Sequence, residues 1–270
     1  MDIGNNLVLG TALGYGESEL NNFVKSFREF NQRDAVVLII DRNFHTFEFM
    51  EKFQIQTIFF ESRFFFDTHI NNSRFVRYLE FLLGNIAKYD RVFLSDTRDI
   101  VFQGDPFEGV PFDCMYFFSE DDDTTIELDQ NFNSPWIKMV FGEEVYEHLK
   151  DKRIICAGTT LGSTGNMIKY LSMMVNVFRQ LKEKGSRAYR VNVDQGIHNY
   201  IAHYADRYFR ESTIKSNGDI VGTVGFTLGR NPGKIKVLRD NVHVGDSKPA
   251  VIHQYDRSPK LTKLYHKKYA

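Results

Sequence analysis

Short apolar runs that alternate with helix-like stripes constrain the fold of this chain more than any other feature of its sequence. Apolar runs at 7–12, 36–40 and 57–60 have the length and composition of buried strands. Apolar residues recur at helical spacing over 20–30, between the first two runs, which predicts a helix with Ser18 as its cap. They recur again over 75–86, which predicts a helix that begins near Asn72 and Ser73. Strands that alternate with helices predict a Rossmann-like α/β fold, in which helices flank a mixed, mostly parallel central sheet.

The later part of the chain predicts the same kinds of element in a less regular order. Apolar runs at 115–118 and 153–162 predict two more strands. Helical stripes predict helices over 168–181 and from 193 onward. The stretch from 108 to 150 lacks a clear period, and we expect it to be rich in loops.

The size and charge of the chain limit its function. Its 270 residues, 42% of them hydrophobic, suffice for the core of one α/β domain, and no linker or repeat divides them, so we expect a single domain over 1–270. The net charge is −1, which leaves no overall field to hold nucleic acid, so any phosphate site must be local. The acidic run at 120–123 predicts a solvated surface, because consecutive like charges repel and cannot all face one ion.

The cysteines and the hydropathy of the chain bear on its compartment. Cys114 and Cys156 are far apart and lack the spacing of metal ligands, which predicts neither a disulfide framework nor a zinc site. The sequence does not open with a basic region followed by a long apolar run, and no apolar stretch approaches the roughly 20 residues of a membrane span. We therefore expect a cytoplasmic chain, or the soluble part of a longer one.

An apolar segment that begins at Val92 runs directly into two carboxylates, Asp96 and Asp99. Parallel sheets bind ligands outside the carboxyl ends of their strands. A turn at such an end can bring both side chains onto one hard cation, which prefers oxygen ligands and shares itself with phosphates. The alternative is that the two acids only form a turn and cap a helix.

A second group of polar residues lies near the carboxyl end of the chain. His253 ends a short apolar strand, and Arg257 and Lys260 follow it. Taken singly, such a histidine is typical of a hydrogen-bonded structural residue, and such cations are typical of a solvated surface. Taken with Asp96 and Asp99, they are the groups needed to hold a divalent ion on a diphosphate and to neutralise a departing phosphate.

With these motifs, most of the chain resembles the nucleotide-sugar-dependent glycosyltransferases of the A-type (GT-A) fold. The block 93–102 is similar to the family's Asp-x-Asp metal motif, in the Asp-x-x-Asp form of the collagen-lysine glycosyltransferase domains, and 103–107 resembles the segment that follows it. The block 155–162 resembles the Asn-Ala/Ser-Gly-x-x-Gly block beside the acceptor pocket, with Cys156 in place of the asparagine. Asp194-Gln195-Gly196 is similar to the Asp-Gln-Gly of glycogenin-like enzymes.

The resemblance implies a set of donor contacts in a nucleotide-binding half, 1–107, and a C-terminal segment that supplies a metal ligand. Manganese, or magnesium, would be bound by Asp96, Asp99 and His253. A nucleotide sugar, UDP-linked in the relatives, would place its base and ribose at Thr11, Ala12 and Tyr15. Its diphosphate would contact Asp96 and either Arg257 or Lys260. Arg74 would contact the phosphates or fix the loop acids; otherwise it forms a surface salt bridge.

The resemblance also implies the chemistry of transfer and an acceptor-binding half, 108–270. Asp194 and Arg74 would be catalytic: Asp194 would stabilise positive charge on the sugar, orient the sugar, or accept the acceptor's proton. A glycan, glycoprotein or lipid-linked acceptor would contact Trp136, Gly158 and Thr159, with Trp136 as a stacking platform or else as core packing. The relatives retain the anomeric configuration, and we expect the same here. The basic tail over 260–268 could rest on an anionic membrane, or it is a solvated helix end.

Two other functions remain open from the sequence. A nucleotidyltransferase acting on sugar phosphates joins the same kind of sheet to metal-binding acids, but its phosphate loop after the first strand should carry basic residues. The loop at 13–16 has none. A carbohydrate-binding protein without turnover is the other alternative, and the intact acids Asp96 and Asp99 argue against it.

Overall fold

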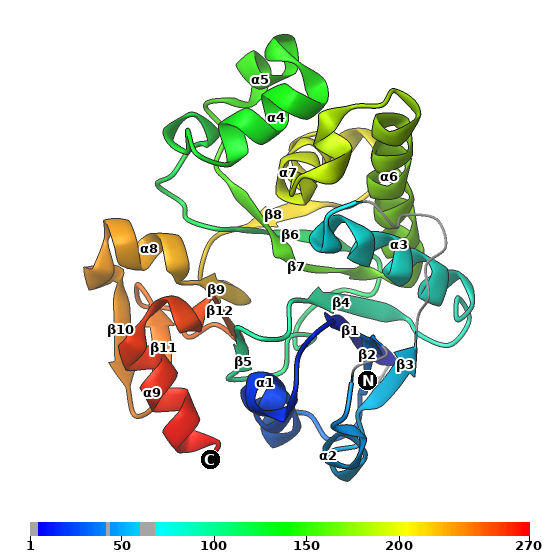
Figure 1. Ribbon diagram of the computed structural model, residues 1–270. Coiled ribbons are helices and arrows are strands. Elements are labelled where there is room, and N and C mark those ends of the chain that lie inside the picture. The colour runs from blue at the N-terminus through cyan, green and yellow to red at the C-terminus, as the bar shows by residue number, and fades with distance from the viewer. Residues whose placement is uncertain (1–4, 42–43, 60–67) are drawn as a thin grey trace.

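The computed structural model describes residues 5–41, 44–59 and 68–270 of the chain. A seven-stranded sheet in the order β3-β2-β1-β4-β7-β6-β8 forms its centre (Figure 1). Strands β1 to β4 are parallel, and β7 runs antiparallel to both of its neighbours, β4 and β6. The predicted α/β fold with a mixed, mostly parallel sheet is confirmed. The strands are β1 (Asn6–Ala12), β2 (Ala35–Ile40), β3 (Gln56–Phe59), β4 (Arg91–Ser95), β6 (Met115–Ser119), β7 (Ile155–Ser163) and β8 (Thr213–Lys215).

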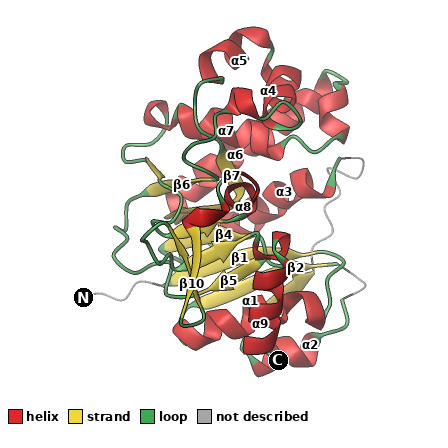
Figure 2. Cartoon of the chain, turned by 90° about the vertical axis from the view of Figure 1, so that its left-hand side faces the viewer, coloured by secondary structure: helices red, strands yellow, loops and turns green. Residues whose placement is uncertain are grey.

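Helices cover both faces of this sheet, because the side chains of each strand alternate between the faces. On one face, Leu7 and Leu9 of β1 pack in a core with helices α3 (Ile70–Leu83), α6 (Thr164–Glu183) and α7 (Asp194–His203). On the other face, Val8 packs in a second core with α1 (Glu17–Phe30) and α2 (Phe47–Lys52). Figure 2 shows the strands as a layer between these two groups of helices.

A second, three-stranded sheet lies beside the first, in the order β5-β12-β9. Its strands are β5 (Ile100–Phe102), β12 (Val251–His253) and β9 (Val221–Thr223). The chain leaves the central sheet at Ser95, turns through 96–99 and joins the second sheet at Ile100. The predicted strand that ends at the two acids is β4, and the apolar residues after the turn form β5, a separate strand in the second sheet. In the antiparallel pairing of β5 with β12, His253 lies opposite Ile100.

The C-terminal helix packs its apolar side against the second sheet. Helix α9 (Pro259–Lys268) buries Leu261 and Tyr265 in a core with Val101 and Ile252, close to the hairpin of β10 (Ile235–Leu238) and β11 (Asn241–Val244). The basic side chains of α9 remain on its outer side. Helix α9 is the basic tail for which contact with an anionic membrane stays a prediction, and its apolar residues lie in this core. None of the helices in the described ranges is long and apolar enough to cross a membrane.

The prediction of a loop-rich stretch over 108–150 was wrong in its second half. Residues 133–149 form α4 (Asn133–Phe141) and α5 (Glu143–Leu149), so Trp136 lies on a helix. Pro135 does not prevent this helix, because a proline in the first turn lacks only an N–H group that would have no partner within the helix. Helix α4 packs on α7 at Gly196, where a Cβ atom would lie 2.8 Å from the Cβ of Trp136.

Two helix starts differ from the expected positions. Helix α1 begins after Gly16, whose N–H donates to the carboxylate of Glu19, and Ser18 does not cap it. Helix α3 begins at Ile70 and not near Asn72, because the ring of His69 accepts from the Asn71 N–H at its start. Phe60, the predicted end of the third strand, lies outside the described residues.

Candidate metal centre and ligand cavity

A cavity of about 880 Å³ opens at the carboxyl ends of β1 and β4. Thr11 and Asp96 line it from these two strand ends, Asp194 from the start of α7, Trp136 from α4 and His253 from the end of β12. Its position agrees with the general location of ligand sites in open α/β sheets. Its volume lies in the range typical of sites for small molecules and cofactors.

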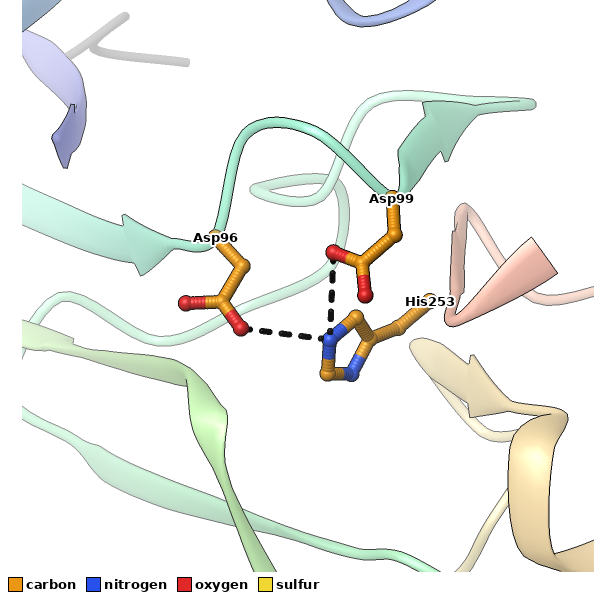
Figure 3. Close-up of side chains that lie close together, drawn as sticks. All are labelled: Asp96, Asp99 and His253. Atoms are coloured by element: carbon orange, nitrogen blue, oxygen red, sulfur yellow. Dashed lines mark ion pairs between the residues drawn. The ribbon is translucent and has the colours of Figure 1, made fainter. Parts of the chain in front are cut away.

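Asp96, Asp99 and His253 come together at one wall of this cavity (Figure 3). Each offers a ligand atom within 4.8 Å of the other two. The Nε2 atom of His253 lies 3.4 Å from Asp96 Oδ2 and 3.7 Å from Asp99 Oδ1. This nitrogen is fully buried and makes no hydrogen bond of good geometry. A buried ring nitrogen that faces two carboxylates in this way fits the donor set of a divalent cation.

Backbone hydrogen bonds fix the turn that carries the two acids. The N–H of Asp96 donates to the carbonyl of Gly158 on β7 at 2.7 Å, and the carbonyl of Asp99 accepts from the N–H of Gln254 at 2.8 Å. The hydroxyl of Thr97 donates to the carbonyl of Thr11 at 2.8 Å. The turn is therefore attached to β7, to the end of β12 and to β1, and the two acids are held on the cavity side.

Gly158 leaves space that the side chains of Asp96 and His253 occupy. A Cβ atom at this position would lie 2.6 Å from Asp96 Oδ2 and 2.5 Å from His253 Cε1. Any other residue would displace one of these groups. Gly158, predicted as an acceptor contact, lines the cavity and lies directly against the candidate metal ligands.

The other ring nitrogen of His253 faces two buried side chains. Its Nδ1 atom lies 3.4 Å from the sulfur of Cys156 and 3.5 Å from the hydroxyl oxygen of Thr223. When Nδ1 carries the proton and donates to one of these atoms, the lone pair on Nε2 points to the two aspartates. Partners of this kind orient histidine ligands in metal sites.

Arg74 joins the turn at 96–99 to Asp194. Its guanidinium forms ion pairs with Asp96 and with Asp194, the latter at 2.8 Å, and donates to the carbonyl of Ala157 at 3.3 Å. The side chain is 11% exposed, which excludes the alternative of a surface salt bridge. Of the roles that the sequence left open, fixing the acids is the one that these contacts match.

The surroundings shift the pKa values of these acids in different directions. Burial alone would raise the pKa of Asp96, but Arg74 and His253 outweigh it and lower the value to about 2. Burial raises the pKa of Asp99, and the nearby charge of Asp96 adds to the rise. Burial also raises the pKa of Asp194, against the opposite effect of Arg74. Asp96 is therefore ionised across the physiological range and attracts cations.

Some of the predicted donor contacts line the cavity and others do not. Thr11, Tyr15 and Arg257 line the cavity. Ala12 is fully buried in the core with α1 and is not among the lining residues. Lys260 is exposed in the first turn of α9 and does not line the cavity either, so Arg257 is the one of the two predicted cations at the site.

The same is true of the predicted acceptor contacts, of which Trp136 and Gly158 line the cavity and Thr159 does not. Trp136 lines the cavity, with its ring 5.4 Å from that of Phe132, which lines it as well. Thr159 is fully buried in β7 and does not reach the cavity. Its place follows from strand geometry, because successive residues point to opposite faces and Gly158 occupies the cavity side.

The sequence interpretation missed Glu120 and two glutamines. Glu120 is only 3% exposed and lines the cavity, and Asp121 is 4% exposed, so the prediction of a solvated acidic run was wrong for its first two members. The carboxylate of Glu120 accepts from the amide groups of Gln195 at 2.9 Å and Gln254 at 3.1 Å, and burial raises its pKa. Gln195 follows Asp194 and Gln254 follows His253, so Glu120 links the two segments that carry these residues. A signal was available, since Glu120 directly follows a buried strand just as Asp96 does.

Comparison with known proteins gives this chain no family. No protein-family model matches it, and no curated protein matches it.

Proposed function

We propose that the chain is a metal-dependent glycosyltransferase of the GT-A kind, which moves a sugar from a nucleotide diphosphate sugar to a hydroxyl acceptor. The observation that supports this most strongly is the convergence of Asp96, Asp99 and His253 in one wall of a large cavity. A lone pair of acids would be explained by a turn. A buried histidine from a distant strand, with its Nε2 atom directed at both acids, is not required by a turn.

The residues around the cavity can be assigned roles in such a transfer. Manganese or magnesium held by Asp96, Asp99 and His253 would stabilise negative charge on the diphosphate as its bond to the sugar breaks. Thr11 and Tyr15 line the end of the cavity nearest β1 and would contact the base and ribose of a UDP-linked donor. Arg74 holds Asp194 in place through their ion pair. The carboxylate of Asp194 would face the transferred sugar, where positive charge develops.

Two features support retention of the anomeric configuration. Inversion needs a carboxylate that is free to take a proton from the acceptor. Asp194 is paired with Arg74, and both oxygens of Glu120 accept hydrogen bonds from amides, so each carboxylate is already engaged with another group of the protein. The acceptor, a glycan on its own or attached to protein or lipid, would lie across the cavity near Trp136 and Phe132.

Thermal unfolding with nucleotides and manganese tests this proposal. We expect UDP to raise the melting temperature in the presence of Mn²⁺ and not in its absence, and GDP and CMP to have smaller effects. Asp99→Asn should abolish the shift, because a neutral amide is a much weaker cation ligand than a carboxylate. Asp246→Asn, at a fully exposed surface position, is the matched control and should keep it.

Hydrolysis of a panel of nucleotide sugars would then separate the candidate functions. Slow, metal-dependent release of UDP from one donor supports the transferase. Pyrophosphate release from UTP and a sugar 1-phosphate would instead indicate a nucleotidyltransferase. Binding of sugars without turnover of any donor would indicate a carbohydrate-binding protein, and no stabilisation by any nucleotide with Mn²⁺ would contradict the proposal.

A further inference from the structure

Arg98 lies in the turn at 96–99, between Asp96 and Asp99, and lines the cavity. Its NH2 atom is 2.9 Å from Asp256 Oδ2, and the side chain is 42% exposed. A guanidinium carries five N–H donors in a planar fork, and this one ion pair leaves others directed elsewhere. The side chain therefore keeps both charge and donors available to a ligand.

A second arginine meets the same aspartate. The Nε atom of Arg257, which also lines the cavity, lies 3.7 Å from Asp256 Oδ1. That oxygen is buried and makes no hydrogen bond. Asp256 thus lies between two guanidinium groups and can neutralise only one of the two charges. With Asp96 and Asp99 engaged by a metal ion, the two guanidinium groups on this wall exceed the single carboxylate of Asp256.

The backbone that presents Arg98 is held in place. Its carbonyl accepts from the hydroxyl of Tyr255 at 3.2 Å, and the same hydroxyl accepts from the amide of Asn22 at 2.9 Å. Tyr255 is buried in the core formed with α9. The position of the Arg98 main chain is therefore fixed by α1 and by the segment after β12, before any ligand binds.

The neighbours of Arg98 place it between the two ends of the donor site. Burial raises the pKa of the Tyr15 hydroxyl, and the charge of Arg98 opposes this rise more than any other charge does. The charges of Asp96 and Asp99 also act on that hydroxyl. Arg98 lines the same cavity as Tyr15, where the nucleoside would bind, and in the sequence it lies between the candidate metal ligands Asp96 and Asp99.

We propose that Arg98 and Arg257 form a diphosphate-binding wall, with Arg98 as the cation that binds the phosphates between nucleoside and metal. The charges of the wall determine the class of ligand. Only an anion with oxygens on more than one side can contact two guanidinium groups and the bound metal ion together. A diphosphate meets this condition, whereas a nucleoside has no charge and a monophosphate spans less of the wall. The inference rests on the proposed function, which supplies the nucleotide.

Binding measurements on a ligand series test it. Calorimetry in the presence of MnCl2 gives the dissociation constants of uridine, UMP and UDP for wild type and for Arg98→Met. We expect the variant to bind UDP roughly tenfold or more weakly, because charge-assisted hydrogen bonds to phosphate are lost. Uridine should bind both proteins equally. Arg98→Lys should recover part of the loss, since it keeps the charge and loses the fork.

Binding of Mn²⁺ alone, followed by electron paramagnetic resonance, distinguishes a ligand contact from a structural role. Removing a positive charge beside two carboxylates should leave the Mn²⁺ affinity of Arg98→Met unchanged or increase it. A damaged turn would lower it. Arg257→Met should show a smaller loss for UDP, because its side chain is more exposed, and Arg179→Met on the outer side of α6 is the control without effect.

The possible failures can be told apart. If wild type binds no nucleotide with Mn²⁺, the proposed function is wrong and the inference falls with it. If wild type binds UDP and Arg98→Met binds it as tightly, the inference alone is overturned. Equal weakening of uridine, UDP and Mn²⁺ in Arg98→Met would also overturn it, because the residue would then act only on the structure of the turn.

Discussion

Gly158 is the residue at which the smallest substitution should disturb the candidate metal centre most. Gly158→Ala adds a single methyl group 2.6 Å from Asp96 Oδ2 and 2.5 Å from His253 Cε1, so one of these groups has to move. We expect Mn²⁺ affinity to fall by about tenfold or more, with the fold retained. Titration followed by electron paramagnetic resonance measures the affinity, and circular dichroism checks the fold.

Gly165→Ala is the matched control for this substitution. A Cβ atom there would meet nothing within 4 Å, in the first turn of α6 and far from the turn at 96–99. Its Mn²⁺ affinity should equal that of wild type. An unchanged affinity in Gly158→Ala would mean that the ligands do not need the space that the glycine leaves.

The sequence predicted a site residue correctly where its place depends on its position after a strand. It failed where contacts with distant parts of the chain determine which way the side chain points. Asp96 and Asp99 follow an apolar run, and the rule that ligands bind at the carboxyl ends of parallel strands was enough to predict them. Glu120 was missed, because in sequence it belongs to an acidic run, and only the fold separates the buried Glu120 and Asp121 from the exposed residues 122–123. Lys260 was expected at the cavity only through the resemblance, as the alternative to Arg257, but its place on α9 leaves it exposed and outside the cavity lining.

At the scale of elements, the strands and helices of the central sheet could be predicted because their apolar periods match the faces they cover. Two features depended on contacts between distant segments. Residues 100–102 form β5 because they pair with β12, which lies far away in the sequence. This pairing cannot be predicted from one sequence alone. Helices α4 and α5 carry weak apolar stripes, and part of their burial comes from packing on α7. The register of β5 with β12 is what brings His253 to the acids.

At the scale of the whole molecule, buried histidines should make stability depend on pH. Burial lowers the pKa of His198 to about 3 and that of His203 to about 4, because it disfavours the charged ring. Below the ordinary value of about 6.5, the unfolded chain binds protons that the folded chain does not. Each of these histidines should therefore lower the unfolding free energy by up to about 1.4 kcal/mol per pH unit as the pH falls from 6.5.

Urea unfolding at several values of pH between about 5 and 6.5 measures this effect. The slope of the unfolding free energy with pH should be smaller in His203→Gln than in wild type, because one titrating ring is gone. His266→Gln, at an exposed position on α9, should leave the slope as it is. Identical slopes for wild type and His203→Gln would show that this ring does not contribute.

We propose that two acids after one strand and a histidine from a distant strand together hold one metal ion beside a nucleotide. Pulsed electron paramagnetic resonance of Mn²⁺ bound in the presence of UDP tests it most directly, because a coordinating imidazole nitrogen couples to the manganese spin. Wild type should bind Mn²⁺ stoichiometrically and show this nitrogen coupling. His253→Gln should lose it. Absence of stoichiometric Mn²⁺ in wild type, or the same coupling in His253→Gln, would contradict the claim.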